Sequence, residues 1–200
     1  MTTSIYVMTL VGVVAFAVSG VIEARRKQMD LVGISAAAFL TAFGGGTVRD
    51  ILLGRYPIFW VTEQSYVAFV LAIAVVAFFV SRRVTLTPSA IAIPDAIGLG
   101  VFSATGAQIA ADMNTPVLIA IVMGVITGSV GGVLRDVVCN EIPTIFARTQ
   151  LYATCAALGA IVYLVARAIG ADTQTGLIAG SLATIALRLA AIRLNLRLPA

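Results

Sequence analysis

The chain has 200 residues, of which 60% are hydrophobic and only 11% are charged, and it contains no histidine. A soluble domain carries about twice that charged fraction, and the mean hydropathy of +1.05 agrees, so the composition predicts an integral membrane protein. The net charge of +4 is no sign of nucleic-acid binding, because the basic residues are spread over short connections rather than gathered on one face. The two cysteines, Cys139 and Cys155, fit no ligand or disulfide pattern. We therefore expect no metal site and no cofactor.

Taken in chain order, seven apolar runs each approach the length of about 20 residues with which a helix crosses a bilayer. Charged residues and helix breakers occupy the connections between them, and the runs account for nearly all of the chain. The sequence therefore predicts an all-α integral membrane protein with seven transmembrane helices in a single membrane domain, residues 1–200. The runs lie near 5–24, 31–48, 64–81, 91–110, 116–134, 150–169 and 175–194.

An internal repeat emerges when the chain is aligned with itself at an offset of 86 residues. The matches include an Arg-Asp pair, a proline, a glutamine and a tyrosine in one ungapped register, which chance rarely supplies, so we infer a duplication. The two copies, about 5–83 and about 91–169, hold three spans each. Because three is odd, the second copy enters the membrane from the opposite side, and the copies are predicted to be inverted repeats. The helix at about 175–194 is unpaired and is expected to complete the bundle or to build a subunit interface. The matched positions are Gly12 with Gly98, Phe16 with Phe102, Gly20 with Gly106, Thr41 with Thr127, Gly45-Gly46 with Gly131-Gly132, Arg49-Asp50 with Arg135-Asp136, Pro57 with Pro143, Gln64 with Gln150, and Tyr66 with Tyr152.

The distribution of lysine and arginine predicts how the chain crosses the membrane, since cytoplasmic loops carry an excess of these residues. One side of the seven-span arrangement receives ten of them and the other side only Arg49, Arg55 and Arg167. The ten-charge side is therefore predicted to be cytoplasmic. This places the N-terminus outside and the C-terminus inside, in a multi-pass protein of the cell membrane.

Each copy contains a glycine cluster that is followed within one turn by an Arg-Asp pair. Glycines weaken a helix because each one costs backbone entropy and packs no side chain, and broken helices with charge at matching places in two halves indicate a permeation or binding site. We therefore expect the second and fifth spans to break at their glycines, with the charged pairs lining or gating the two mouths of one pathway. The alternative is close helix packing through the glycines, with each Arg-Asp pair as a salt-bridged anchor. The residues are Gly44, Gly45, Gly46, Arg49 and Asp50 in the first copy, and Gly131, Gly132, Arg135 and Asp136 in the second.

Small hydroxyl side chains extend the candidate pathway, because a partly hydrated ion passes through weak, multiple oxygen contacts. Thr41, Thr127 and Ser129 lie just before the expected breaks, and Ser19 and Thr105 occupy matched positions in the first and fourth spans. The alternative is that each hydroxyl simply bonds to its own helix backbone.

Two acids lie near the predicted inner ends of the first and fourth spans. Glu23 and Asp95 are suited to attract cations at an inner vestibule. The alternative is an interfacial residue or, for Asp95, an acid that favours a helix start.

These motif residues resemble a known family. The stretch Gly-Gly-Gly-x-x-Arg-Asp, followed by Leu53-Gly54 and Pro57 and repeated as Gly-Gly-x-x-Arg-Asp and Pro143, is similar to the trimeric intracellular cation (TRIC) channels and their prokaryotic relatives, some of which carry a glycine-transporter label. The resemblance covers nearly the whole chain. It implies a homotrimer in membrane lipid in which each subunit holds its own pore for potassium and other monovalent cations, gated where the two glycine-rich helices kink. The second copy departs from the triplet, because Val130 stands where the first copy has Gly44.

Two functions remain open. A passive potassium-permeable cation channel is favoured, because no ionisable residue stands alone at mid-membrane to couple transport to protons or sodium. The alternative is a small-solute transporter, for glycine, that uses the same inverted repeats for alternating access. The sequence has no nucleophile elbow, no phosphate-binding loop with a lysine and no carboxylate pair at hydrolase spacing, so we do not expect an enzyme.

Overall fold

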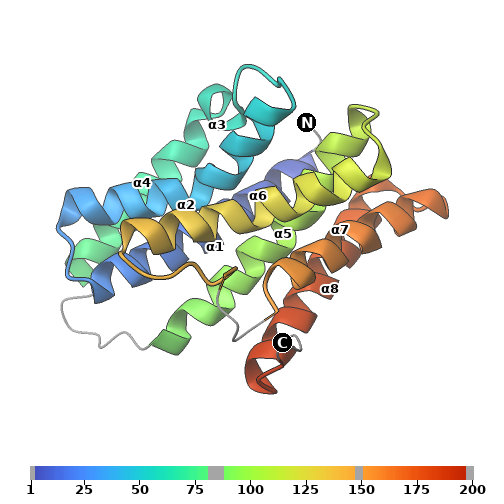
Figure 1. The fold of residues 1–200 in the computed structure, drawn as a ribbon. Coiled ribbons are helices and arrows are strands. Elements are labelled where there is room, and N and C mark those ends of the chain that lie inside the picture. Colours follow the sequence, from blue (N-terminus) through green and yellow to red (C-terminus); the bar gives the residue numbers. More distant parts are fainter. Residues whose placement is uncertain (1–2, 81–87, 147–150, 197–200) are drawn as a thin grey trace.

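The computed structural model describes residues 3–80, 88–146 and 151–196, and every regular element in that part of the chain is helical. Seven of these helices are long, and each overlaps one of the seven predicted apolar runs (Figure 1). The elements are α1 (Thr3–Arg26), α2 (Leu31–Leu52), α3 (Phe59–Thr62), α4 (Gln64–Val80), η2 (Pro88–Ile91, a 3-10 helix), α5 (Ala92–Asp112), α6 (Val117–Val138), α7 (Ala153–Ala168) and α8 (Thr173–Arg193).

The described helices suit a bilayer in both length and surface. Helices α1, α2, α6 and α8 are long and apolar enough to cross a membrane, and α4 and α7 are shorter apolar helices. Large apolar side chains stand exposed on them, such as Phe79, Val117 and Leu182. Apolar surface on this scale marks a lipid or protein contact rather than a face toward water.

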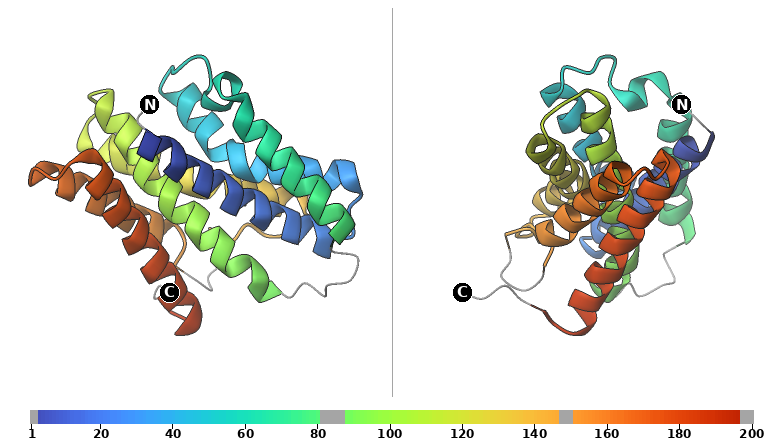
Figure 2. Two further views of the ribbon diagram at one scale, coloured as in Figure 1. Left: turned by 180° about the vertical axis from the view of Figure 1, so that it is seen from behind. Right: turned by 90° about the vertical axis from the view of Figure 1, so that its right-hand side faces the viewer.

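Helix α5 lies at the centre of the bundle and packs against α1, α6, α7 and α8 (Figures 1 and 2). Glycines on α5 allow this close packing. A Cβ atom at Gly98 would lie 2.1 Å from the ring of Phe16 in α1, and one at Gly100 would lie 2.7 Å from the carbonyl oxygen of Ser181 in α8. Helix α8 thus completes the bundle by packing on α5 and α7.

Helices α2 and α6 run unbroken through their glycines, so the expected helix breaks are wrong for this conformation. The two helices cross closely instead. A Cβ atom at Gly45 would lie 2.0 Å from the carbonyl oxygen of Thr127, and one at Gly131 would lie 2.2 Å from the carbonyl oxygen of Thr41. Ordinary contact distances for a Cβ atom begin at 3.4 Å, so a larger residue meets the backbone of the opposite helix. These glycines serve close packing, as in the alternative interpretation.

The contacts between the two repeats are reciprocal. Gly45 faces Thr127, and Gly131, the residue matched to Gly45, faces Thr41. Thr41 and Thr127 are themselves matched at the 86-residue offset. Phe16 and Phe102 are also a matched pair, and their rings stack with centroids 5.4 Å apart. Reciprocal contacts of this kind are the pattern of a two-fold interface, so the packing between the copies follows the duplication in the sequence.

Candidate functional site

The two Arg-Asp pairs lie at two separate cavities, one toward each end of α1. The second-motif cavity, lined by Arg135 and Asp136, has a volume of about 480 Å³ and is also lined by the C-terminal parts of α1 and α8. The first-motif cavity, lined by Arg49, has a volume of about 360 Å³ and is also lined by the first part of α1 and the last part of α5. Glu23 lines the former and Thr9 the latter, and their separation along α1 corresponds to about 21 Å of helix.

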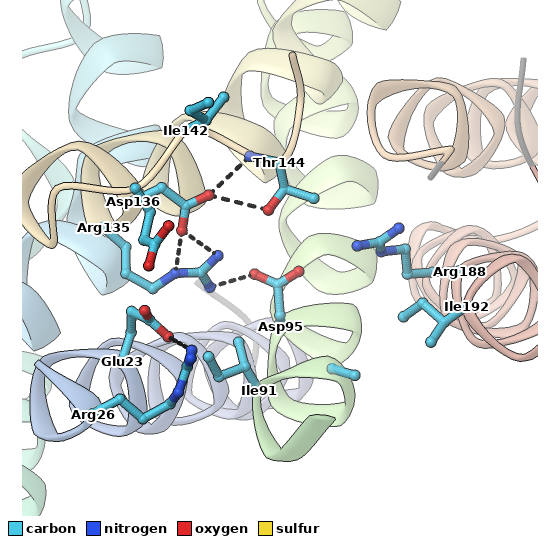
Figure 3. A pocket seen from close by; sticks show the side chains of 12 residues that line it. Glu23, Arg26, Ile91, Asp95, Arg135, Asp136, Ile142, Thr144, Arg188 and Ile192 are labelled. Carbon is cyan, nitrogen blue, oxygen red and sulfur yellow. Dashed lines mark hydrogen bonds and ion pairs between the residues drawn. The ribbon is translucent and has the colours of Figure 1, made fainter. Parts of the chain in front are cut away.

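Arg135 is 3% exposed and joins α6 to α5 and α1, and its ion pairs with Asp136 and Asp95 are drawn in Figure 3. Its Nε donates to Asp136 Oδ1 at 2.8 Å, and its Nη1 donates to Asp95 Oδ1 of α5 at 2.7 Å and to Ser19 Oγ of α1. The hydroxyl of Tyr152 donates to the same Asp95 oxygen at 3.2 Å. Buried charge is tolerated in a protein interior only when it is paired and hydrogen-bonded, and here two carboxylates share one guanidinium.

Two further buried charges face this cavity from α1 and α8 (Figure 3). Glu23 Oε2 accepts from Arg26 at 2.6 Å, but Oε1 has no hydrogen-bond partner among the described residues. The guanidinium of Arg188 lies 4.8 Å from the ring centroid of Tyr152, and its Nε is likewise unpartnered in the described part of the chain. Buried polar atoms usually have partners, so each of these two atoms is an unsatisfied polar group beside the cavity.

Arg49 is also 3% exposed and lines the first-motif cavity. Its Nε and Nη2 donate to Asp50 Oδ1 at 2.9 and 2.8 Å, and its guanidinium carbon lies 5.5 Å from the ring centroid of Phe59. The exposed Arg55 approaches the same oxygen of Asp50 at 3.4 Å. The first motif therefore forms a tight ion pair that has one carboxylate for two guanidinium groups.

The two aspartates also tie the segment that follows each helix to the bundle. Asp50 Oδ2 accepts from the backbone N–H of Phe59 at 3.0 Å, and Asp136 Oδ2 accepts from the backbone N–H of Thr144 at 2.9 Å. The anchoring interpretation is therefore confirmed for both aspartates. Arg49, Arg135 and Asp136 also line the cavities, and their role in lining or gating a pathway stays a prediction.

The two cavities differ at one matched position. Asp95, the second carboxylate of Arg135, corresponds at the 86-residue offset to Thr9. Thr9 lines the first-motif cavity and donates its hydroxyl proton to the carbonyl oxygen of Ile5 at 2.9 Å. Arg49 therefore lacks the acid that the other repeat supplies to its matched arginine.

An aromatic pair lies between the two cavities. Phe102 lines the first-motif cavity and stacks on Phe16, and both rings are almost fully buried. The closest approach of α2 and α6, at Gly45 and Gly131, lies beside them, since a Cβ atom at Gly131 would also reach the Phe16 ring at 3.4 Å. The stacked rings therefore pack beside the crossing of α2 and α6.

Comparison with known proteins places the chain in a family. A family model described as glycine transporter matches twice, over residues 6–82 and 92–168. The chain is 41% identical to a UPF0126 membrane protein of Vibrio cholerae over 199 residues, which are 99% of this chain and 83% of that protein. It is 38% identical to the UPF0126 inner membrane protein YadS of Escherichia coli over 197 residues, or 98% and 95% of the two proteins. Among solved structures it is similar to the TRIC trimeric intracellular cation channel orthologue from Rhodobacter sphaeroides, with 38% identity and a TM-score of 0.91 over 98% of this chain and 100% of that one. The chain belongs to the TRIC family.

Membership of the TRIC family confirms the resemblance drawn from the motif residues and the expectation of an all-α multi-pass membrane protein. It also confirms that the chain is not an enzyme, because the similar solved structures are ion channels. The two matches to the family model begin 86 residues apart, at the offset that the matched residues show.

The predicted hydroxyl residues of this TRIC-family chain fall into two groups. Thr41, Thr127 and Ser129 donate to the carbonyl oxygen four residues earlier in their own helices, at 2.6 Å in each case, which is the alternative use of a helical hydroxyl. Ser19 instead accepts from Arg135. Thr105 bonds its own helix at 2.9 Å but also lines the first-motif cavity.

The remaining predicted glycines of the TRIC motif also lie in close contacts. A Cβ atom would lie 2.4 Å from Leu134 at Gly44, 2.4 Å from Phe59 at Gly46, and 2.6 Å from the Tyr152 hydroxyl at Gly132. Gly46 and Gly132 therefore bring their helices against residues that contact or adjoin the two buried arginines.

Arg188 of this TRIC-family chain is a cavity residue that the sequence interpretation missed. It lines the second-motif cavity and is 4% exposed. A signal was available, because Ser181, Thr184 and Arg188 follow a helical spacing along one face of α8, and all three are buried. A polar stripe on an otherwise apolar helix indicates a face toward the bundle interior rather than toward lipid.

Proposed function

We propose that the chain is a channel for monovalent cations, with potassium as the main permeant ion, no cofactor, and one pathway in each subunit of a homotrimer in the lipid bilayer. The observation that carries the proposal is the likeness over the whole chain to the TRIC cation channel orthologue of Rhodobacter sphaeroides. On this proposal, the two cavities are the vestibules of the pathway. Arg49, Arg135 and the Phe16–Phe102 stack form the closed region between them.

The charges at the second-motif cavity support cation entry at that end. Four acids and three arginines line it, and the buried Oε1 of Glu23 has no partner in the described part of the chain. A cavity with low-dielectric walls and a surplus of carboxylate raises the local concentration of cations. Glu23 is therefore the residue at which we expect an entering cation to make its first direct contact.

The arrangement of the repeats is part of the same proposal. We infer seven transmembrane helices, with α1, α2 and α4 as one repeat, α5, α6 and α7 as its inverted copy, and α8 as the extra helix. The reciprocal glycine contacts and the stacked matched phenylalanines support this layout. An inverted pair places one Arg-Asp motif toward each membrane face, as a pathway with two similar mouths requires.

In the proposed orientation, the second-motif cavity faces the cytoplasmic side of the membrane. The lysine and arginine excess lies on that side, so that α1 starts outside and α8 ends inside. Cations would then meet the acidic cavity from the cytoplasmic solution.

Glycine transport is the second candidate, because the family model that matches both halves is described as a glycine transporter. A zwitterion needs donors for its carboxylate and acceptors for its ammonium group. The first-motif cavity offers both kinds of charge, with Arg49, Arg55 and Glu63 in its lining.

Purified protein in planar bilayers distinguishes the two functions. A channel gives discrete unitary currents with potassium permeability above chloride permeability. Replacing Glu23 by Gln should lower the unitary conductance for current leaving the second-motif side, because the acceptor at that mouth loses its charge. Asp30→Asn is the matched control, since Asp30 is an exposed acid at the same end of the bundle that caps α2 outside the cavity lining. Saturable glycine uptake into liposomes without unitary currents at any voltage would refute the channel and favour the transporter.

A further inference from the structure

The first-motif cavity contains a buried hydroxyl without a partner. Tyr66 is 1% exposed and lines the cavity, and its OH makes no hydrogen bond of ordinary geometry to any described residue, with the hydroxyl of Thr9 close by. Its matched residue, Tyr152, donates to the carboxylate of Asp95. An unsatisfied buried hydroxyl costs about 1–3 kcal/mol, so a phenol in this position is expected to donate to something that occupies the cavity.

Arg49 presents a second unused donor to the same space. Its Nε and Nη2 are taken by Asp50, while Nη1 makes no hydrogen bond within the described ranges. In the other repeat, the same nitrogen of Arg135 donates to Asp95. Because Thr9 stands at the matched position and uses its own hydroxyl proton on Ile5, Arg49 lacks that counter-charge.

The charges around these donors select a monovalent ligand. Arg49 and Arg55 line the cavity together with one acid, Glu63. Asp50, behind Arg49, already holds one negative charge against the guanidinium. The two arginines and Glu63 give the lining a net charge of +1, which one negative charge neutralises. A second charge on the ligand would be uncompensated beside Glu63 and Asp50.

We propose that the first-motif cavity binds a small monovalent anion, a halide or a monocarboxylate, between Arg49 and Tyr66. The anion occupies the place that the carboxylate of Asp95 fills in the other repeat. The cavity volume of about 360 Å³ accommodates chloride with bound water or the whole of formate. Bound there, the anion gives a hydrogen-bond acceptor to the Tyr66 hydroxyl and to Arg49 Nη1, and it screens the positive charge of Arg49. Water alone in the cavity is the alternative, because it would satisfy the hydroxyl but leave the charge unscreened.

Anion binding is tested on purified full-length protein in detergent, so the result does not depend on whether the protein conducts ions. Chloride and formate are titrated as potassium salts at constant ionic strength against potassium gluconate, with chloride-NMR line width and thermal denaturation as readouts. Gluconate is the reference anion because we expect its six-carbon polyhydroxy chain to keep its carboxylate out of the place that Asp95 fills in the other repeat. We expect saturable binding of chloride, formate or both, and whichever anion binds should raise the denaturation temperature. Binding of formate but not chloride identifies the site as one for carboxylates, and the reverse identifies it as one for halides.

Three variants locate the site. Tyr66→Phe should weaken binding about tenfold, because one hydrogen bond to a charged ligand is lost, while thermal stability in gluconate stays unchanged or rises. Thr9→Asp should abolish binding by supplying the carboxylate that the other repeat carries. Tyr152→Phe, the matched control, should lose stability in every salt but keep the anion affinity. The proposal is refuted if neither anion binds, if the two tyrosine variants weaken binding equally, or if Thr9→Asp binds as wild type does.

Discussion

Replacing Gly45 by alanine should destabilise the protein, although alanine is the better helix former. A Cβ atom at Gly45 would lie 2.0 Å from the carbonyl oxygen of Thr127, against 3.4 Å for the shortest ordinary contact. Relieving the overlap therefore needs a displacement of about 1.4 Å between α2 and α6, and overpacking of this kind costs about 1–3 kcal/mol. We expect a cost near the upper end of this range, because the opposing atom belongs to the backbone and cannot turn aside as a side chain can. The helix propensity of alanine returns about 1 kcal/mol, which leaves a net loss of about 2 kcal/mol.

The adjacent glycine provides the matched control. At Gly44 the Cβ atom would meet Cδ1 of Leu134 at 2.4 Å, and the next nearest atom lies at 3.6 Å. The end of a leucine side chain can turn aside, and the second copy already carries Val130 at the matched position. Gly44→Ala should therefore be neutral or slightly stabilising.

Thermal denaturation of the two variants in detergent, followed by the fluorescence of Trp60, checks this difference. For a chain of this size, a loss of about 2 kcal/mol lowers the Tm by roughly 4–8 °C. We expect that decrease for Gly45→Ala and little change for Gly44→Ala. If the two variants melt together at the wild-type temperature, α2 and α6 do not make the close contact between Gly45 and the carbonyl oxygen of Thr127.

Three more predictions concern orientation, the buried ion pairs and the start of α8. Single cysteines in place of the exposed Met113 and Leu194, in a cysteine-free background, should react with an impermeant maleimide from opposite membrane faces; reaction of both from one face contradicts the inverted layout. Asp95→Asn should cost about 1–3 kcal/mol in thermal stability, because Arg135 loses one of its two buried carboxylates, and a variant as stable as wild type would count against that role. The hydroxyl and backbone N–H groups of Thr175 hold the pKa of Asp172 below its usual value. Its capping contribution is therefore present at neutral pH and lost as the pH falls through that lowered pKa, so the Tm difference between wild type and Asp172→Ala should shrink on acidification, and a constant difference would refute it.

The helices and the duplication could be predicted because both can be recognised from the residue types alone. Apolar runs of bilayer length mark the helices, and an ungapped offset reveals the repeat without any knowledge of contacts. The cavity residues Arg49 and Arg135 were found in the same way, since each stands in a motif that occurs twice.

What a residue meets across the fold could not be predicted. The glycines of α2 and α6 were interpreted as helix breaks, because the sequence gives their backbone entropy cost but not the carbonyl oxygen that faces them. Asp95 was weighed as a helix-start acid or a cation attractor, since nothing local shows that Arg135 lies 2.7 Å away. The difference between the two cavities depends on pairing Thr9 with Asp95, and it becomes meaningful only when the unused donors of Arg49 and Tyr66 are seen.

The obstacle that faces Gly45 and Gly131 is a main-chain carbonyl, which every residue type possesses. Exchanging Thr127 or Thr41 would leave that oxygen in place. A genetic selection for second-site suppressors of a bulky residue at Gly45 should therefore return reversions, or changes elsewhere that move the whole α2–α6 crossing, and no compensating exchange at the contact itself. In an ordinary core contact, a larger side chain at one position can be compensated by a smaller one at its neighbour. Gly45 and Gly131 lack this possibility, because the atom nearest to each is a backbone oxygen. The two copies differ at the matched positions Thr9 and Asp95, whereas both have glycine at the positions of this crossing, Gly45 and Gly131.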